Sequence, residues 1–334
     1  MPDSKRPRIL LSVGPGTLPS QGRDRMDFTA YNILLSGRPR LSGREMVEAL
    51  PEIDAIAEIV HDDVPPRPQA THEDLRQLAR FLDEAARRDD IDGIVWCQGT
   101  NTLEETAYFL NLTVRTDKPV VVVGAQRPFT ALSTDAHLNL VNAVRVACCP
   151  EAAGLGVVTA TNGEIIAARD VTKTFTYQPQ TFRARDLGVL GYADPDQIVF
   201  YRTPTRRHTA RSEFDIQAID QIPAVEILYG HTGVNAGLAR AAVQLGAVGL
   251  VFAGTGAGAL GAYSEIAKEL AAEGIAVVRS ARVGEGRVLA TGNGHAPGLI
   301  AADNLNPQKA AVLLALGLTR TRDPVILQEM FDIY

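Results

Sequence analysis

The stretch from Gly93 to Ala143 constrains the fold more than any other part of the chain, because it twice repeats the order strand, turn, helix. The apolar segment GIVWC precedes the turn QGTNT (residues 98–102), and a second apolar segment, KPVVVV, precedes the turn GAQRP. Thr102, followed three residues later by Glu105, is typical of a capping box at a helix start. Ligands of open α/β sheets bind where parallel strands end. The two polar turns therefore predict a binding edge.

The same alternation continues along the chain and predicts two α/β domains, each with a parallel sheet. Residues 1–204 form the predicted larger N-terminal domain, residues 205–222 a polar linker, and residues 223–334 a smaller C-terminal domain. Strands are expected at Arg8–Val13, Ile56–Val60, Gly156–Ala160, Val225–Tyr229, Val248–Phe252 and Ile275–Val278. Helices are expected after the caps Ser42 and Thr71, from Val234 and Tyr263, and near Pro307 and Pro324.

Charge and length favour a small-molecule partner. The formal net charge is −6, from 33 basic and 39 acidic residues with both signs interspersed, so no basic stripe indicates nucleic acid or an anionic membrane. The apolar run near the N-terminus is too short for a secretory signal, and no run approaches membrane-spanning length. We expect no nucleic-acid or membrane partner.

Cysteine, histidine and glycine patterns predict neither a metal nor a cofactor. The three cysteines have no disulfide or metal spacing, and Cys148-Cys149 ends a predicted helix, which favours core packing and a reducing cytoplasm. The six histidines also lack a metal spacing. The segment GAGALG (256–261) matches G-x-G-x-x-G, but the next strand ends in VVRS without an acidic residue, so we interpret it as a glycine-rich turn.

Five segments resemble one known family. GTNTLEETAYFLNLTV (99–114) and KPVVVVGAQRPFTALSTDAHLNLVNAV (118–144) are similar to the central blocks of the bacterial L-asparaginase/glutaminase family, whose members hydrolyse side-chain amides with a threonine nucleophile. The similarity continues collinearly through ARDVTKTFTYQPQTF (168–182), GVLGY (188–192) and NPQKAAVLL (306–314). The resemblance implies a flavodoxin- or Rossmann-like larger domain, a small amide substrate, and a homotetramer built as a dimer of dimers.

The first strand ends in GPGTL, and the resemblance makes Thr17 the candidate nucleophile, with a proline inserted between the family's two glycines. Gly16 and Gly99 then belong to turns that would contact the substrate through their backbones. The loop at residues 19–41 is long and aperiodic, which is typical of an active-site lid. The family's lid carries a tyrosine; Tyr31 is the one available here, and a packing role for it fits equally well.

The resemblance also implies a relay of threonine, aspartate and lysine, which carries over to Thr100, Asn101 and Lys173. The aspartate has become asparagine. Without that carboxylate, a buried Lys173 has a lower pKa and is a better base for Thr100. Asn101 itself can neither accept a proton nor carry charge. The relay then either runs on threonine and lysine alone or is inactive.

Other departures fall where the family binds the amino-acid part of its substrate. The Ser-Gln-Asp segment for the α-carboxylate is absent, and the nearby cation Arg67 reads as a surface residue. No carboxylate occurs at 291–293, where the family has a glutamate for the α-ammonium, and Glu285 comes several residues early. Losing the partner of a buried charge costs about 3–5 kcal/mol, or about a hundredfold or more in binding. Asn101, Gln126 and Asn293 remain as candidate substrate-binding residues.

Three interpretations follow. The first is an amidohydrolase whose substrate lacks the α-ammonium group, for example a deaminated, aromatic or cyclic amide beside Asn101, Gln126 and Phe129. The second is an ordinary L-asparaginase in which Glu285 or another group replaces the missing carboxylates. The third is a binding protein that retains the pocket but has lost the relay.

Overall fold

The structure is a computed structural model that describes residues 6–62, 71–292 and 295–334. Arg67 and Asn293 lie outside these described residues. The chain divides into two compact units, Met1–Ile216 and Gln217–Tyr334. Each unit consists of a sheet covered by helices, which confirms the predicted α/β fold class.

The first unit is built on an eight-stranded sheet with the order β10-β9-β6-β5-β4-β3-β1-β2. Its parallel part, β2-β1-β3-β4-β5, has the strand order of flavodoxin-like folds. The parallel strands are β1 (Arg8–Val13), β2 (Glu58–His61), β3 (Gly93–Cys97), β4 (Val120–Val123) and β5 (Val157–Thr161). The antiparallel strands are β6 (Glu164–Ala167), β9 (Gly191–Ala193) and β10 (Ile198–Phe200), and β7 (Val171–Lys173) pairs with β8 (Phe182–Ala184) separately.

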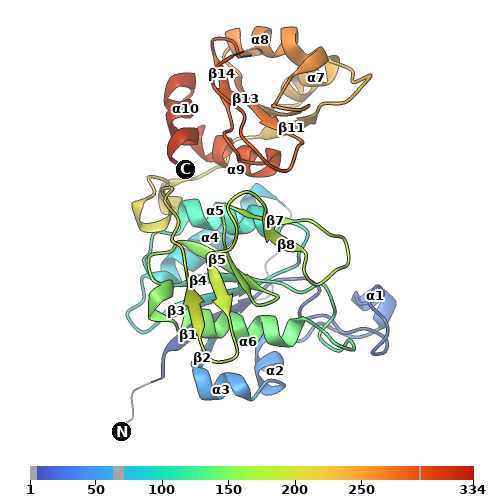
Figure 1. The fold of residues 1–334 in the computed structure, drawn as a ribbon, viewed down its shortest axis with the longest axis vertical. Coiled ribbons are helices and arrows are strands. Elements are labelled where there is room, and N and C mark those ends of the chain that lie inside the picture. The colour runs from blue at the N-terminus through green and yellow to red at the C-terminus, as the bar shows by residue number, and fades with distance from the viewer. Residues whose placement is uncertain (1–5, 63–70, 293–294) are drawn as a thin grey trace. The chain divides into compact units, whose positions relative to one another are not determined.

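Helices cover both faces of this sheet (Figure 1). On one face lie α4 (His72–Ala86) and α5 (Leu103–Thr113); on the other lie α2 (Gly43–Glu48), α3 (Glu52–Ile56) and α6 (Ala136–Ala147). Every residue of β3 and β4 is therefore buried, as expected for central parallel strands. The short helix α1 (Ile33–Ser36) lies within the long loop after β1, and η1 (Pro150–Ala152) follows α6.

Local signals fixed several helix starts. The predicted capping boxes form at Ser42 with Glu45 and at Thr71 with Asp74. The apolar residues of α4 at helical spacing, Leu75, Leu78, Leu82 and Ala85, are buried. Thr102 is the N-cap residue of α5, but its side chain makes no capping hydrogen bond, so the capping box predicted there is wrong. The ψ of Thr102, 19°, differs from the extended value of ordinary N-caps and explains this failure.

Of the predicted linker, residues 205–216 belong to the first unit and residues 217–222 to the second. The linker forms the short helices η2 (Thr209–Arg211) and η3 (Ile216–Ala218). The Ser212 hydroxyl donates a hydrogen bond to the Leu112 carbonyl of α5, and the Phe214 side chain is buried. These contacts give the polar stretch a fixed structure.

The second unit contains a four-stranded sheet with the order β11-β12-β13-β14, and all its pairs are parallel, as predicted. Its strands are β11 (Val225–Tyr229), β12 (Gly249–Gly254), β13 (Ala276–Ala281) and β14 (Leu299–Ala301). Its helices are α7 (Gly237–Gln244), η4 (Gly261–Tyr263), α8 (Ser264–Ala272), α9 (Pro307–Gly317) and α10 (Pro324–Ile333). Within this unit α9 and α10 lie on one side of the sheet and α7 and α8 on the other (Figure 1).

The turns after β1 and β3 touch through their backbones. Adjacent strands β1 and β3 form the point where the strand order reverses, which is where flavodoxin-like sheets bind ligands. The Gly14 amide donates to the Cys97 carbonyl at 2.7 Å, and the Gly99 amide donates to the Pro15 carbonyl at 2.9 Å. A Cβ atom on Gly16 would lie 2.2 Å from the Gly99 nitrogen. Only glycine at position 16 permits this approach.

We expect Gly16→Ala to lower the free energy of unfolding by about 1–3 kcal/mol, because the added methyl group forces two backbone segments apart. Chemical denaturation measures this change. The control is Gly237→Ala, which adds the same group at the exposed start of α7, where the nearest atom is the flexible Asn235 side chain. Equal stability of Gly16→Ala and the unchanged chain would contradict the contact.

Candidate active site

Thr17 lies in the turn that follows β1 and is 7% exposed. Its Oγ1 donates a hydrogen bond to the Tyr31 hydroxyl oxygen at 3.2 Å. The turn is closed by the Ser20 hydroxyl, which donates to the Gly16 carbonyl at 2.6 Å. The structure thus brings together Thr17 and the lid tyrosine, two residues that the sequence singled out separately.

The loop that carries Tyr31 is held by Asp27, a residue that the sequence analysis missed. Its carboxylate accepts hydrogen bonds from the Ala30 amide at 2.8 Å, the Thr29 amide at 3.2 Å and the Arg23 guanidinium at 2.7 Å. The Ala30 amide above all, and then Arg23, lower the pKa of Asp27 to about 2. The aspartate within the loop was the available signal, since aspartate side chains commonly accept hydrogen bonds from nearby backbone amides of a turn.

Thr100 and Lys173 form the second hydroxyl centre. The Lys173 Nζ donates to Thr100 Oγ1 at 2.8 Å, and Thr100 Oγ1 donates to the Gln126 Oε1 at 3.1 Å. Thr100 is 5% exposed. Three segments distant in sequence, namely the turn after β3, the turn after β4 and strand β7, therefore supply one hydrogen-bonded chain.

Lys173 is positioned by Glu104, which the sequence analysis also missed. The Lys173 backbone amide donates to Glu104 Oε2 at 2.9 Å, which fixes the end of β7 to the first turn of α5. Burial lowers the pKa of the Lys173 ammonium, and the negative charge of Glu104 opposes this effect. The lysine is thus easier to deprotonate than a solvated one, which is the direction expected when the aspartate is missing.

The remaining candidates occupy different environments. The Asn101 side chain is exposed, and Gln126 is partly exposed. Phe129 is 6% exposed and belongs to the core beside α6. In the second unit, Glu285 and Thr291 are exposed.

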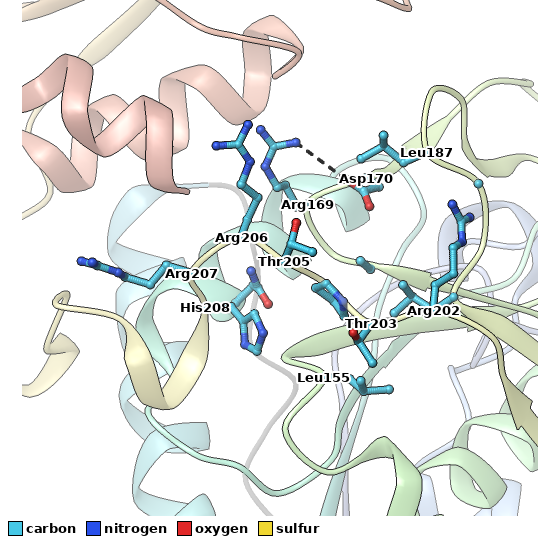
Figure 2. Close-up of a pocket in the computed structure, with 15 residues that line it drawn as sticks. Leu155, Arg169, Asp170, Leu187, Arg202, Thr203, Thr205, Arg206, Arg207 and His208 are labelled. Atoms are coloured by element: carbon cyan, nitrogen blue, oxygen red, sulfur yellow. Dashed lines mark ion pairs between the residues drawn. The ribbon is translucent and has the colours of Figure 1, made fainter.

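A separate cavity of about 250 Å³ lies in the first unit and is drawn in Figure 2. Arginines line it, among them Arg169, whose guanidinium lies 3.7 Å from the Asp170 carboxylate. His208 lies at its base; burial, and then the charge of Arg211, lower its pKa. Thr17, Thr100 and Lys173 do not line this cavity, so the candidate site rests on the hydroxyl network.

Two classes of site find no support in the described ranges 6–62, 71–292 and 295–334. Within them, no group of three or more histidine, cysteine, aspartate or glutamate residues is arranged to hold a metal ion. None of the helices there has the length and apolar character needed to cross a bilayer.

The fold and the site together define a class. Buried threonines beside a lysine, at the strand-order reversal of a flavodoxin-like sheet, suit nucleophilic catalysis by a hydroxyl group. Residues 9–206 match the family model described as Asparaginase, N-terminal, and residues 224–331 match that of the Glutaminase/Asparaginase C-terminal domain. The chain therefore belongs to the asparaginase family of amidohydrolases, which act on carbon–nitrogen bonds other than peptide bonds and on small amide substrates.

Individual relatives agree with this family. The chain is 41% identical to L-asparaginase 2 of Bacillus subtilis over 98% of its own length and 87% of that protein. It is 38% identical to a glutaminase-asparaginase of Pseudomonas fluorescens over 98% of its own length and 90% of that protein. The crystal structure of a probable cytoplasmic L-asparaginase from Campylobacter jejuni superposes with a TM-score of 0.89 at 36% identity. The match covers 98% of this chain and 100% of that one. The predicted family and enzyme class are confirmed.

We expect Lys173→Met to stabilise the protein near neutral pH. Burial lowers the pKa of Lys173, so protonating it costs folding free energy that is largest below the folded pKa and vanishes above the ordinary value of 10.5. The gain in melting temperature over the unchanged chain should therefore shrink as pH rises toward 10.5. Thermal unfolding across this range tests it. The exposed Lys268, substituted in the same way, should show no such trend; a trend of opposite sign for Lys173→Met would refute the argument.

Proposed function

We propose that the protein hydrolyses the amide bond of a small carboxamide by nucleophilic attack of Thr17, with release of ammonia. The observation that carries this proposal is the pair of hydroxyl centres on two touching turns. Thr17 is hydrogen-bonded to Tyr31, and Thr100 is hydrogen-bonded to Lys173. A threonine hydroxyl that attacks a carbonyl needs a neighbour to take its proton. Thr17 donates to the Tyr31 hydroxyl, and Thr100 lies beside the Lys173 amine.

The reaction proceeds in two steps. Thr17 Oγ1 attacks the amide carbonyl while its proton passes through the neighbouring hydroxyl groups to the leaving nitrogen, which departs as ammonia and leaves an ester on Thr17. Water then attacks the ester and regenerates the threonine hydroxyl with release of the acid. In each step the negative oxygen requires aligned donors, for which the amides of the two glycine turns are candidates.

The proposed substrate lacks an α-ammonium group. Asn101 occupies the position where the family resemblance places a carboxylate, and its exposed amide cannot neutralise a cation. Substrates without the ammonium group, such as a desamino amide, avoid leaving a charge uncompensated. Gly16 and Gly99 would contact the substrate through their backbones, and Gln126 and Asn293 remain proposed contacts.

A second candidate is hydrolysis of L-asparagine or L-glutamine. The names of the relatives from Bacillus subtilis and Pseudomonas fluorescens favour it. In this case another acidic group, for example Glu285, would bind the ammonium. A homotetrameric assembly and a cytoplasmic location stay predictions under either candidate.

We expect Thr17→Ala to reduce turnover by at least about 1,000-fold while the protein stays folded, because the reaction loses its nucleophile. Ammonia release is measured with L-asparagine, L-glutamine and their desamino analogues. The control Thr71→Ala removes the α4 cap and costs about 1 kcal/mol of stability without changing turnover. Near-normal turnover by Thr17→Ala would place the nucleophile elsewhere, with Thr100 next.

We expect Asn101→Asp to raise the ratio of kcat/KM for L-asparagine to that for its desamino analogue by about tenfold or more, because a carboxylate pairs with the ammonium. The charge should also hold Lys173 protonated and lower the rate on the desamino compound. Asn235→Asp adds the same charge to the second unit as a control. An unchanged or lower ratio would count against the ammonium argument, and ordinary asparaginase rates in the unchanged protein would favour the second candidate.

A further inference from the structure

Gln126 is the third member of the Thr100 hydrogen-bonded chain. Its Oε1 accepts from Thr100 Oγ1, and its Nε2 donates to the carbonyl oxygens of Phe175 at 3.3 Å and Thr176 at 3.2 Å. These two carbonyls belong to the segment after Lys173, from which Thr174 separates them. The Gln126 backbone amide, in turn, donates to the Asp135 carboxylate at 2.9 Å. Gln126 is therefore held by its backbone in the turn after β4 and by its side-chain amide at the segment after β7.

The partners of Gln126 determine which way its amide group faces. Backbone carbonyls only accept hydrogen bonds, so the group beside Phe175 and Thr176 must be the NH₂ donor. The opposite orientation would place the amide oxygen against two carbonyl oxygens and lose both bonds. The oxygen of Gln126 therefore faces Thr100, and it can only accept.

This orientation fixes the proton on Thr100. A hydroxyl group has one proton to donate, and here that proton is directed to Gln126. Lys173 Nζ, at 2.8 Å from the same oxygen, must then be the donor in its own hydrogen bond. A neutral lysine could still donate an N–H group to this oxygen, but its lone pair could not accept the Thr100 proton while that proton is directed to Gln126.

We propose that Gln126 is a positioning residue that directs the Thr100 hydroxyl proton away from Lys173 and so favours the protonated lysine until substrate displaces this hydrogen bond. The inference rests on the proposed role of Thr100 and Lys173 as the basic centre. It assigns Gln126 a part in setting the pH range of the enzyme, separate from the substrate contact that its place in GAQRP suggested.

Three charged groups near this hydrogen-bonded chain stay unchanged when Gln126 is substituted. Glu104 of α5 accepts from the Lys173 backbone and raises the lysine pKa, while burial lowers it. On β8, the Arg183 guanidinium lies over the Phe175 ring, 5.4 Å from its centroid. Asp135 accepts from the backbone amide of Gln126. Substitutions of the Gln126 side chain leave all three charges in place.

Two substitutions of Gln126 should shift the lysine in opposite directions. Gln126→Met removes the acceptor, frees the Thr100 proton for neutral Lys173, and should lower the lysine pKa by roughly half a unit to one unit. Gln126→Glu keeps an acceptor but adds a negative charge, and should raise it by about 1 unit or more. A general loss of structure would not produce opposite shifts.

The lysine is observed directly by carbon NMR of protein labelled at lysine Cε. The chain has five lysines, so the spectrum is simple, and Lys173→Met identifies the signal by its disappearance. The rising limb of kcat/KM against pH is measured in parallel on the best amide substrate. The control is Gln180→Met, which replaces an exposed glutamine in the β7–β8 hairpin that carries Lys173. It should change neither measurement.

Each outcome decides a different point. Changes of opposite sign in the Lys173 pKa, measured by NMR and matched by the pH–rate limbs, would support the inference. An unchanged Lys173 pKa, or changes of the same sign in both variants, would overturn it even if ammonia is released. If the Lys173 pKa changes but the pH dependence of kcat/KM does not, Gln126 controls the lysine pKa, and Lys173 is not the base. If one variant fails to fold, the sign of the shift in the other still decides.

Discussion

The close contact between the glycines of two turns is the constraint on which the candidate site depends. Parallel pairing of β1 with β3 brings their carboxyl ends side by side, and the Gly16 and Gly99 backbones then meet at a separation that excludes a side chain. Each turn presents a threonine one residue later. The position of both hydroxyls thus follows from strand pairing, and only their partners come from elsewhere in the chain.

Those partners lie on segments outside the parallel sheet core. Tyr31 comes from the loop that Asp27 organises, and Lys173 comes from β7, which Glu104 ties to α5. The turn that carries Thr17 is held by backbone contacts with the neighbouring turn, while Tyr31 and Lys173 sit on peripheral segments, each held by one buried carboxylate. Because of this division, residues around the site can change without loss of the threonine geometry.

Much of this architecture could be predicted because its signals are local or periodic. The apolar runs of β1, β3 and β11, the caps at Ser42 and Thr71, and the prolines that start α9 and α10 each act within a few residues. The carboxylate of Glu104 could not be assigned in the same way, because its partner, the Lys173 amide of β7, is distant in sequence. Strand β14, three residues long after a glycine-rich stretch, carries too little pattern to be recognised.

The loss of one carboxylate changes what the lysine can do, but not in the simple manner that the sequence suggested. Asn101 removes a charge from the turn after β3, yet Glu104 still provides a negative group near Lys173, and the net effect of burial and charge is a lowered lysine pKa. Gln126, which is uncharged, also influences the lysine, because it accepts the only proton that the Thr100 hydroxyl can donate. The protonation state of this centre is therefore set by three side chains from separate turns. For that reason, a single substitution in the threonine motif does not by itself decide whether the relay is active.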